Sequence, residues 1–433
     1  MRSSKIFSVW HGIPLFTLLF FLSPILIILS SVFADYSENW SHIYEYVLAD
    51  YILNSLILVS GVSILVMIIG SLTAWLVTNY QFFGKRFFEW GLILPLAIPP
   101  YILAYTFTGL FDSYGTMNEI ARSLFNLQQN EMLFPNIRNI YGAIIVFSFT
   151  LYPYVYLICR TAFLNQSRSM FEVGRTLGLS QASIFLKLAL PLVRPALIAG
   201  TMIVAMETLS DFGAVDHFAI STFTTGIFRT WYGMYDLTTA MQLASMLLIF
   251  ITFCLVIERT SRKNANYSTI GSNFKPTQVT RLGTLGSSVC FFVCFVPIFI
   301  GFILPILEIL NWSLRFNTDF FNERFFSISM NTILLSILSA ILCTFIAMII
   351  NFSIRYKSSP VIKSINPFLN IGYAVPGLIL AVGIVQLFVF VDSKLLSSLE
   401  GYFLTGSIFG LIFALIRQSL LSFNYNFILL NQP

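Results

Sequence analysis

Long apolar runs separated by short polar stretches make up most of this chain. A helix needs about 20 consecutive apolar residues to cross a hydrocarbon core of about 30 Å. Ten runs reach that length, and each predicts a membrane-spanning helix. They lie near residues 12–33, 52–78, 88–111, 140–159, 191–210, 238–257, 287–312, 330–354, 365–391 and 403–423. The pattern predicts an all-α polytopic membrane protein.

Composition excludes a soluble domain. The 433 residues are 57% hydrophobic and only 10% charged, and the mean hydropathy is +0.82. No water-soluble fold needs so much apolar surface. The first apolar run follows Arg2 and Lys5, as in a signal peptide, but its length of about 22 residues is too great for a cleaved segment. We therefore expect it to be retained as a membrane anchor.

The charges in the loops predict an orientation. Basic residues such as Arg160, Lys187 and Arg259 fall in alternate loops, and acidic residues such as Asp35 and Asp392 fall in the others. Lys and Arg are enriched on the cytoplasmic side of membrane proteins. One assignment satisfies all loops, and it places the N-terminus in the cytoplasm of a multi-pass protein. The excess of positive charge thus reflects membrane topology rather than nucleic-acid binding.

A single long polar stretch divides the chain. Residues 258–286 are rich in Ser, Asn, Thr, Lys and Gly, which is typical of a flexible linker. The expected organisation is a first transmembrane half at 1–257, a cytoplasmic linker at 258–286, and a second transmembrane half at 287–433.

The two halves resemble a repeat. Asn54 and Asn331 open corresponding apolar segments, and Pro99 lies as far beyond Asn54 as Pro376 lies beyond Asn331. A single offset along the chain therefore relates both pairs, and we call it the repeat interval. Six predicted segments separate the two copies, and because that number is even both copies face the same way. The chain thus reads as two parallel repeats related by an axis along the membrane normal.

Proline and glycine interrupt a predicted spanning helix at the matched place in each half. Interrupted helices in corresponding positions are the strongest sequence pointer to a translocation pathway, although a simple packing kink has the same signature. The residues concerned are Pro95, Pro99 and Pro100 in the first half and Gly372, Pro376 and Gly377 in the second.

A basic, polar island lies between two apolar runs at residues 172–195. Gly178 follows Glu172 within the island and can adopt the left-handed conformation found at helix ends. Pro191 suits the first turn of a following helix, where its missing N–H has no partner in any case. A short surface helix, a glycine turn and re-entry into the membrane are expected, although spacing alone also fits an ordinary cytoplasmic loop.

The same island resembles the EAA signature of MetI-like membrane subunits of ABC importers. The match consists of Glu172, Gly178, Leu190 and Pro191, with Gly174 departing from the alanine that is usual there. The resemblance implies that the segment couples the permease to cytoplasmic ATP-hydrolysing subunits. The chain has no Gly-rich Walker-type loop, so ATP hydrolysis is expected on those partners and the chain itself is not expected to be an enzyme.

Two acidic residues, Glu207 and Asp211, lie at the end of the fifth apolar run. A carboxylate within such a run tends to face a cavity or a partner, and its oxygens suit hard cations. Both residues can equally lie in a solvated interface. The five cysteines all fall in apolar runs, where packing is the common role, so neither a metal centre nor a cofactor is predicted.

The sequence around these two acids resembles that of the ferric-iron importer permeases. The matching segments are Met206–Gly213 (METLSDFG) and Thr222–Arg229 (TFTTGIFR). The resemblance implies import of ferric iron delivered by an extracytoplasmic binding protein, in a bacterial inner membrane, with Glu207 and Asp211 on the pathway. Importers of thiamine, polyamines or phosphonates share the architecture and remain alternatives. A secondary transporter would explain the repeat but not the EAA-like island, and a channel lacks a filter-like sequence.

One alignment predicts an incomplete second half. Tyr141-Gly142 in the first half corresponds to Thr405-Gly406 in the second, and the same offset applied to Glu172 leads just beyond Pro433. The second half is therefore expected to stop before its own EAA-like segment, giving about ten crossings where the family has about twelve. A truncated, non-transporting permease, or one completed by another chain, is the corresponding hypothesis.

Overall fold

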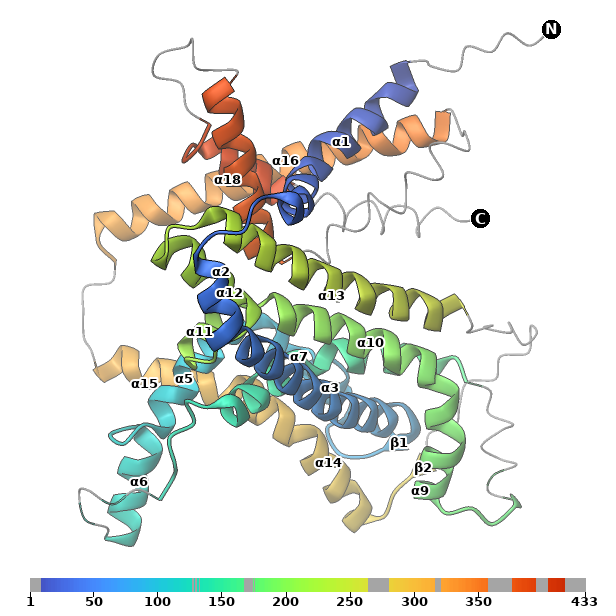
Figure 1. Cartoon of the computed structure of the whole chain (residues 1–433). Helices are drawn as coiled ribbons and strands as arrows, with labels where there is room; N and C mark the ends of the chain where they lie inside the picture. Colours follow the sequence, from blue (N-terminus) through green and yellow to red (C-terminus); the bar gives the residue numbers. More distant parts are fainter. Residues whose placement is uncertain are drawn as a thin grey trace, which may run out of the picture. The chain divides into compact units, whose positions relative to one another are not determined.

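A computed structural model of the chain is shown in Figure 1. The residues that it describes are 9–126, 128, 131, 133–166, 174, 176–263, 280–315, 321–356, 376–394 and 404–416. Glu172 and Gly372, both singled out by the sequence, lie outside them.

Helices account for nearly all of the described secondary structure. In chain order the elements are α1 (Val9–Ser30), η1 (Ser31–Phe33), α2 (Asn39–His42), η2 (Ile43–Val47), α3 (Leu48–Asn79), β1 (Tyr80–Gln81), α4 (Lys85–Gly91), η3 (Leu94–Ala97), α5 (Pro100–Phe111), α6 (Thr116–Phe125), α7 (Ile140–Leu164), α9 (Gln181–Ile184), η4 (Phe185–Ala189), α10 (Leu190–Ser210), α11 (Gly213–His217), α12 (Phe223–Phe228), η5 (Arg229–Gly233), α13 (Leu237–Lys263), β2 (Thr280–Arg281), α14 (Thr284–Ile298), η6 (Phe299–Ile303), α15 (Leu304–Arg315), α16 (Glu323–Tyr356) and α18 (Gly377–Lys394). The two short strands pair in parallel, Tyr80 with Thr280.

The all-α, polytopic fold class is confirmed. Within the described residues, eight helices are long and apolar enough to cross a membrane, and a bent helix pair gives a ninth span if counted as one. They correspond to the first nine of the ten predicted segments. Of the tenth, 403–423, the structure describes only residues 404–416, which are helical from residue 408.

The described helices form two compact units that do not follow the predicted halves. Unit 1 comprises residues 1–43, 226–251 and 318–433, and unit 2 comprises 44–225 and 252–317. Each unit therefore takes its helices from both sides of the 258–286 stretch. The first helix of each predicted half lies in the unit formed mainly by the other half.

Unit 2 is built around α7, which packs between α3 and α10. Glycines allow this close approach. A Cβ on Gly70 of α3 would lie 2.8 Å from Cβ of Val155, and a Cβ on Gly200 of α10 would lie 3.0 Å from Cα of the same valine. Tyr152 and Tyr156 of α7 are completely buried beside this contact. Interdigitation of this kind, rather than periodicity, excludes lipid and water from the three-helix core.

The continuous helix formed by α14, η6 and α15 completes unit 2, where it contacts α3, α4, α5 and α7. Trp312 packs its indole ring against Gly109 of α5, so closely that a Cβ on Gly109 would lie under 3.0 Å from the ring. This helix begins the second half of the sequence and yet packs on the helices of the first. We call it the exchanged helix of unit 2.

In unit 1 the exchanged helix is α1, which packs on α16 and α18 (Figure 1). Its end is also attached to the start of α13. Ser245 Oγ donates a hydrogen bond to the Ile28 carbonyl at 2.7 Å, and Gln242 Nε2 donates to the Ser31 carbonyl at 3.1 Å. Asp236, just before α13, accepts from Asn39 Nδ2 at 2.8 Å and from Ser37 Oγ at 2.5 Å.

A helix start recurs at the repeat interval. α5 begins at Pro100 and α18 begins at Gly377. The offset between these two residues is the one that separates Asn54 from Asn331. The interval that relates sequence motifs thus also relates the starts of these two helices.

Candidate functional site

The carboxyl end of α10 carries the two acids that the sequence singles out. Glu207 lies in the last turn of α10 and Asp211 directly follows the helix. Oδ1 of Asp211 accepts hydrogen bonds from the N–H groups of Ala214 at 2.8 Å and Val215 at 3.3 Å. Burial raises the pKa of the Asp211 carboxyl to about 6, although these two N–H groups act in the opposite direction. Asp211 therefore caps α11. The Glu207 carboxylate makes no comparable hydrogen bond to a backbone N–H among the described residues.

The two segments that resemble parts of the ferric-iron permeases touch in the fold. Thr224 Oγ1 donates a hydrogen bond to the Asp211 carbonyl at 2.8 Å and lies 3.0 Å from Thr222 Oγ1. Thr225 Oγ1 accepts from the Thr222 N–H at 2.8 Å. All three threonines are buried, so these bonds are shielded from water and hold the loop rigidly.

The start of the first repeat contributes to the same cluster. Asn54 Nδ2 of α3 donates to the Ser221 carbonyl at 3.0 Å, and Ser55 Oγ accepts from the Phe223 N–H at 3.3 Å. The Asn-Ser pair that marks the repeat therefore fixes the position of the threonine loop. We refer to Asn54, Ser55, Asp211 and Thr222–Thr225 as the polar cluster.

The first interrupted helix is broken as predicted. Lys85–Ala97 and Pro100–Phe125 are bent by 88° relative to each other. Pro95 lies in the 3₁₀ turn η3, Pro99 has ψ of 143°, and Pro100 starts α5. Pro99 restricts the residue before it and Pro100 cannot continue the hydrogen-bonding pattern of the preceding turn, so the helix stops and restarts in a new direction.

The helix after the break packs against α11. A Cβ on Gly213 would lie 3.3 Å from Cβ of Tyr101. His217 Nε2 lies 2.9 Å from Thr108 Oγ1, and the His217 ring makes an edge contact with Tyr105, with the ring centroids 5.6 Å apart. The structure therefore joins Pro99–Pro100, Asp211 and the threonine loop at one end of unit 2.

The second interruption is only partly described. Pro376 immediately precedes α18, and its carbonyl accepts from the Leu380 N–H at 3.0 Å. Gly377 is the first residue of α18. Both match the positions of Pro99 and Pro100 in the first half.

The EAA-like island lies at the opposite end of α3 and α10. Gly178 has φ of +75°, and the Leu179 N–H bonds to the Gly174 carbonyl at 3.1 Å. A bond that spans a left-handed glycine in this way is the Schellman arrangement that ends helices. The predicted glycine turn is confirmed.

The packing around Gly174 explains why glycine replaces the usual alanine of the signature. It is buried, and a Cβ there would lie 2.8 Å from Cδ1 of Leu188 and 3.4 Å from Cγ1 of Ile184. The large Leu188 side chain fills the space that an alanine methyl group would otherwise need. Leu188 thus takes up the space that the missing methyl group leaves at Gly174.

Re-entry into the membrane differs from the expectation of a separate helix. Pro191 lies in the first turn of α10, but α9, η4 and α10 form one continuous helical run from Gln181 to Ser210. The π-helical turn η4, in which the Leu190 N–H bonds to the Phe185 carbonyl, directly precedes the proline. The wider π-helical turn accommodates Pro191, which has no N–H to donate. The helix therefore contains a π-bulge at this point and is not interrupted.

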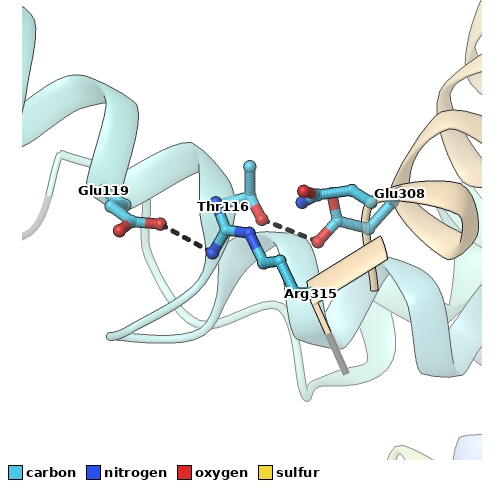
Figure 2. Close-up of polar contacts among 5 residues, drawn as sticks. Thr116, Glu119, Glu308 and Arg315 are labelled. Atoms are coloured by element: carbon cyan, nitrogen blue, oxygen red, sulfur yellow. Dashed lines mark hydrogen bonds and ion pairs between the residues drawn. The ribbon is translucent and has the colours of Figure 1, made fainter. Parts of the chain in front are cut away.

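Glu308 of α15 is a buried acid that the sequence pattern did not single out. This carboxylate is only 4% exposed and accepts a hydrogen bond from Thr116 Oγ1 at 2.7 Å (Figure 2). It also accepts from Asn311 Nδ2 at 3.4 Å. Arg315 pairs with Glu119 at 3.3 Å beside it. These residues line a groove of about 540 Å³ together with Leu110, Met117, Ile120, Ser123, Leu304 and Leu307. An acid within the apolar run 304–314 was the available signal, the same one that marked Glu207.

No metal centre is formed within the part of the chain that the structure describes: no three His, Cys, Asp or Glu side chains come together there. The five cysteines are buried thiols. The polar cluster can therefore fix loops and line a path, but it is not a closed ligand set for an ion.

Comparison with known proteins identifies the central part of the chain. Residues 66–260 match the family described as "Binding-protein-dependent transport system inner membrane component". This segment is less than half of the chain, and it is similar to that family. The matched segment contains both halves of the broken helix, the EAA-like island and the polar cluster except for Asn54 and Ser55.

Individual relatives extend the similarity beyond this segment. The "Fe(3+)-transport system permease protein FbpB 2" of Haemophilus influenzae is 27% identical over 345 residues, which cover 78% of this chain and 63% of the relative. The "Putative ferric transport system permease protein FbpB 1" of the same organism is 24% identical, covering 78% and 56%. The "Sulfate transport system permease protein CysT" of Escherichia coli is 28% identical but covers only 34% of this chain. The chain thus spans 63% and 56% of the lengths of the two iron-transport relatives.

Proposed function

We propose that the chain is the permease subunit of an ATP-driven importer of ferric iron, delivered by an extracytoplasmic binding protein. The observation that carries this proposal is the buried bond between Thr224 and Asp211, which joins the two segments that resemble ferric-iron permeases. Similarity to the two ferric relatives over 78% of the chain, against 34% for a sulfate permease, supports the same solute.

Uptake by cells carrying the complete system tests the solute. Labelled ferric iron, sulfate, thiamine and a polyamine are supplied in parallel to cells that lack other uptake routes for each. We expect accumulation of iron alone, and its dependence on the binding protein. Uptake of another solute without iron would overturn the assignment and favour the same machine with a different cargo.

The proposed translocation pathway runs through the interrupted helices. Irregular backbone within a membrane is tolerated where protein covers it or where it lines a cavity. The pathway would comprise Pro95, Pro99, Pro100, Gly372, Pro376, Gly377, Glu207 and Asp211. Because Asp211 caps α11, we assign it the task of holding the pathway's mouth and assign contact with the cationic cargo to Glu207.

The EAA-like island is the proposed docking site for the ATPase subunits. Glu172, Gly174, Gly178, Leu190 and Pro191 would form it, and the basic loops nearby support a position in the cytoplasm, on the same side as the N-terminus. Glu172→Lys reverses a charge at this interface, and we expect loss of both ATPase association and uptake. Glu38→Lys, the same reversal at an exposed residue of unit 1, is the control. Intact association in Glu172→Lys would exclude the docking role.

The proposed organisation keeps the sequence halves as the evolutionary units. Residues 1–257 and 287–433 would each correspond to one permease half, joined by a cytoplasmic linker at 258–286. The recurrence of a helix start at Pro100 and Gly377 supports this assignment. The exchange of the first helix between units would then hold the two halves together in the bacterial inner membrane.

A further inference from the structure

Three irregularities of the helices in unit 2 meet at one glycine. Gly301 lies in the π-helical turn η6 of the exchanged helix. A Cβ on Gly301 would lie under 3.0 Å from the Phe149 carbonyl oxygen of α7, and 3.1 and 3.2 Å from Cβ and Cγ of Pro95. Pro95 belongs to the 3₁₀ turn before the helix break, and α7 contains an internal proline, Pro153.

The Phe149 carbonyl is available at this point because of Pro153. In an α-helix the N–H one turn later in the chain bonds to each carbonyl, and Pro153 has no N–H to offer Phe149. Only a residue without a Cβ lets a second backbone approach such a carbonyl so closely. The contact is therefore backbone against backbone, and no side-chain rotation can relieve an added methyl group.

Gly301 also determines where the break can lie. The ring of Pro95 lies on the same side of Gly301 as the Phe149 carbonyl, and the turn η3 also contacts α7 directly, so the exchanged helix packs on the junction between α7 and η3. The close approach at Gly301 therefore holds Pro95, α7 and the exchanged helix together. Thus a helix from the second part of the sequence bears on the break in the first.

We propose that Gly301 is a positioning residue for transport: it holds the break at Pro95 against α7, so that the broken helix moves only together with the exchanged helix. This inference rests on the proposed function, because the movement matters only if the chain is a transporter. Gly301 contacts no cargo in this proposal and acts through Pro95.

The test compares three substitutions in the full chain, assembled with its ATPase and binding protein. Gly301→Ala adds the methyl group at the contact. Gly286→Ala adds one on α14, where the nearest atom is a side-chain carbon of Leu282 at 3.4 Å, and it is the matched control. Alanine is the better helix former in both places, so helix propensity alone cannot explain a loss. Pro153→Ala restores an N–H that can bond to the Phe149 carbonyl within α7.

For Gly301→Ala we expect the maximal rate of iron uptake, per molecule in the membrane, to fall at least tenfold. The concentration of loaded binding protein that gives half of the maximal rate should stay unchanged, because the outer surface is not altered. Gly286→Ala should transport at the parental rate. Adding Pro153→Ala to Gly301→Ala should restore most of the loss, since the carbonyl then withdraws into α7.

A second readout is independent of the cargo. Cys294 of the exchanged helix is completely buried, two turns before Gly301. In a detergent-purified chain that keeps only this cysteine, a small maleimide should label Gly301→Ala at least tenfold faster than the parent. Gly286→Ala should label at the parental rate, and the double variant should return toward it.

The outcomes separate the two proposals. Parental labelling and uptake in Gly301→Ala, or a failure of Pro153→Ala to reverse either effect, would overturn the positioning role. If Gly301→Ala does not accumulate in the membrane, recovery of its level and uptake in the double variant supports the role, and no recovery overturns it. If labelling follows the expected order while even the parent transports no iron, the proposed cargo is wrong and the contact at Gly301 stands.

Discussion

Each of the two compact units places a glycine against a backbone carbonyl, and the exchanged helix supplies the carbonyl in one unit and the glycine in the other. In unit 1 a Cβ on Gly383 of α18 would lie 2.7 Å from the carbonyl oxygen of Pro24 in the exchanged helix α1. In unit 2 the exchanged helix supplies the glycine, Gly301, and α7 supplies the carbonyl of Phe149. Pro24 and Gly301 are counterparts, since the repeat interval separates them as well. The geometry of close approach recurs, whereas the residue that permits it does not.

The two units shift the pKa of an aspartate in opposite directions. Asp211 in unit 2 is buried with two backbone donors, and burial raises its pKa to about 6. Asp236 in unit 1 is partly buried, which opposes ionisation, but bonds from Ser37, Asn39 and Thr239 outweigh this and lower its pKa to about 2. One carboxyl thus favours protonation in the folded state and the other favours ionisation.

The largest predicted effect comes from Asp211→Asn. A folded pKa of about 6 above the ordinary 3.8 stabilises the fold at acidic pH, and this stabilisation is lost as pH rises through about 6. The loss amounts to roughly 3 kcal/mol by pH 8, since one pKa unit is about 1.4 kcal/mol. Asparagine stays neutral and can still cap α11. Thermal unfolding in detergent should show the variant more stable than the parent at pH 8 and similar to it at pH 4, whereas parallel pH profiles would contradict the assignment.

Asp236→Asn should show the reverse dependence. A depressed pKa stabilises the fold above pH 3.8, and that contribution disappears as pH falls toward 2. The variant should therefore unfold at a lower temperature than the parent at pH 7, and the difference should shrink steadily on acidification. A difference that grows on acidification would remove the contrast between the two units.

Gly383→Ala tests the glycine contact of unit 1. The methyl group would meet the Pro24 carbonyl at 2.7 Å and Cδ1 of Ile28 at 2.8 Å, and overpacking of this kind costs about 1–3 kcal/mol. Gly12→Ala on α1, with no atom within 4 Å, is the control. The thermal midpoint of the full chain should fall for Gly383→Ala alone. Equal midpoints for both variants would mean that α1 and α18 separate easily.

Gly178→Ala and Gly233→Ala form a pair that isolates backbone strain. Neither added methyl group meets an atom within 4 Å, but only Gly178 has a positive φ, +75°. A left-handed alanine costs about 1–2 kcal/mol. Gly178→Ala should weaken binding of the ATPase subunits in pull-down titrations, and Gly178→Asn should weaken it less. If Gly233→Ala weakens binding as much, strain at the turn is not the cause.

Thr224→Val and Ser37→Ala should have the smallest effects, and for Thr224→Val we expect a loss of about 1 kcal/mol in the free energy of unfolding. It removes the hydroxyl that bonds to the Asp211 carbonyl at 2.8 Å and keeps the shape of the side chain. Ser37→Ala in unit 1 should cost less, because Asp236 keeps Asn39 and Thr239 as donors. Chemical unfolding of both variants, with the exposed Thr161→Val as control, orders the three. A larger loss in Ser37→Ala would reverse the predicted ranking of the two units.

Features that depend on local chemistry could be predicted from the sequence. Helix spans follow from run length, the break follows from Pro99–Pro100, and the left-handed turn follows from Gly178. Each is set by residues a few positions apart, where dihedral preferences and hydrogen-bonding capacity decide the outcome.

Features that depend on packing between residues far apart in the sequence could not be predicted in this way. Nothing in the periodicity of residues 284–315 indicates that they pack on α5 rather than on their sequence neighbours. The capping role of Asp211 was likewise hidden, because it depends on where the Ala214 and Val215 N–H groups point. The buried Glu308 could have been noticed, since its apolar context matches that of Glu207, but its partner Thr116 lies 192 residues away.

The exchange of α1 has a consequence for biosynthesis. Ser30 ends α1, but α16 and α18, on which α1 packs, begin only at Glu323 and Gly377. At about 5–20 residues per second, a ribosome needs roughly 15–60 s to reach the first of them. During that interval α1 is in the bilayer without α16 and α18, so the surrounding lipid or an insertion chaperone must cover the face that they later bury. Unit 1 thus cannot be completed until α18 has been made, although α1 is made long before it.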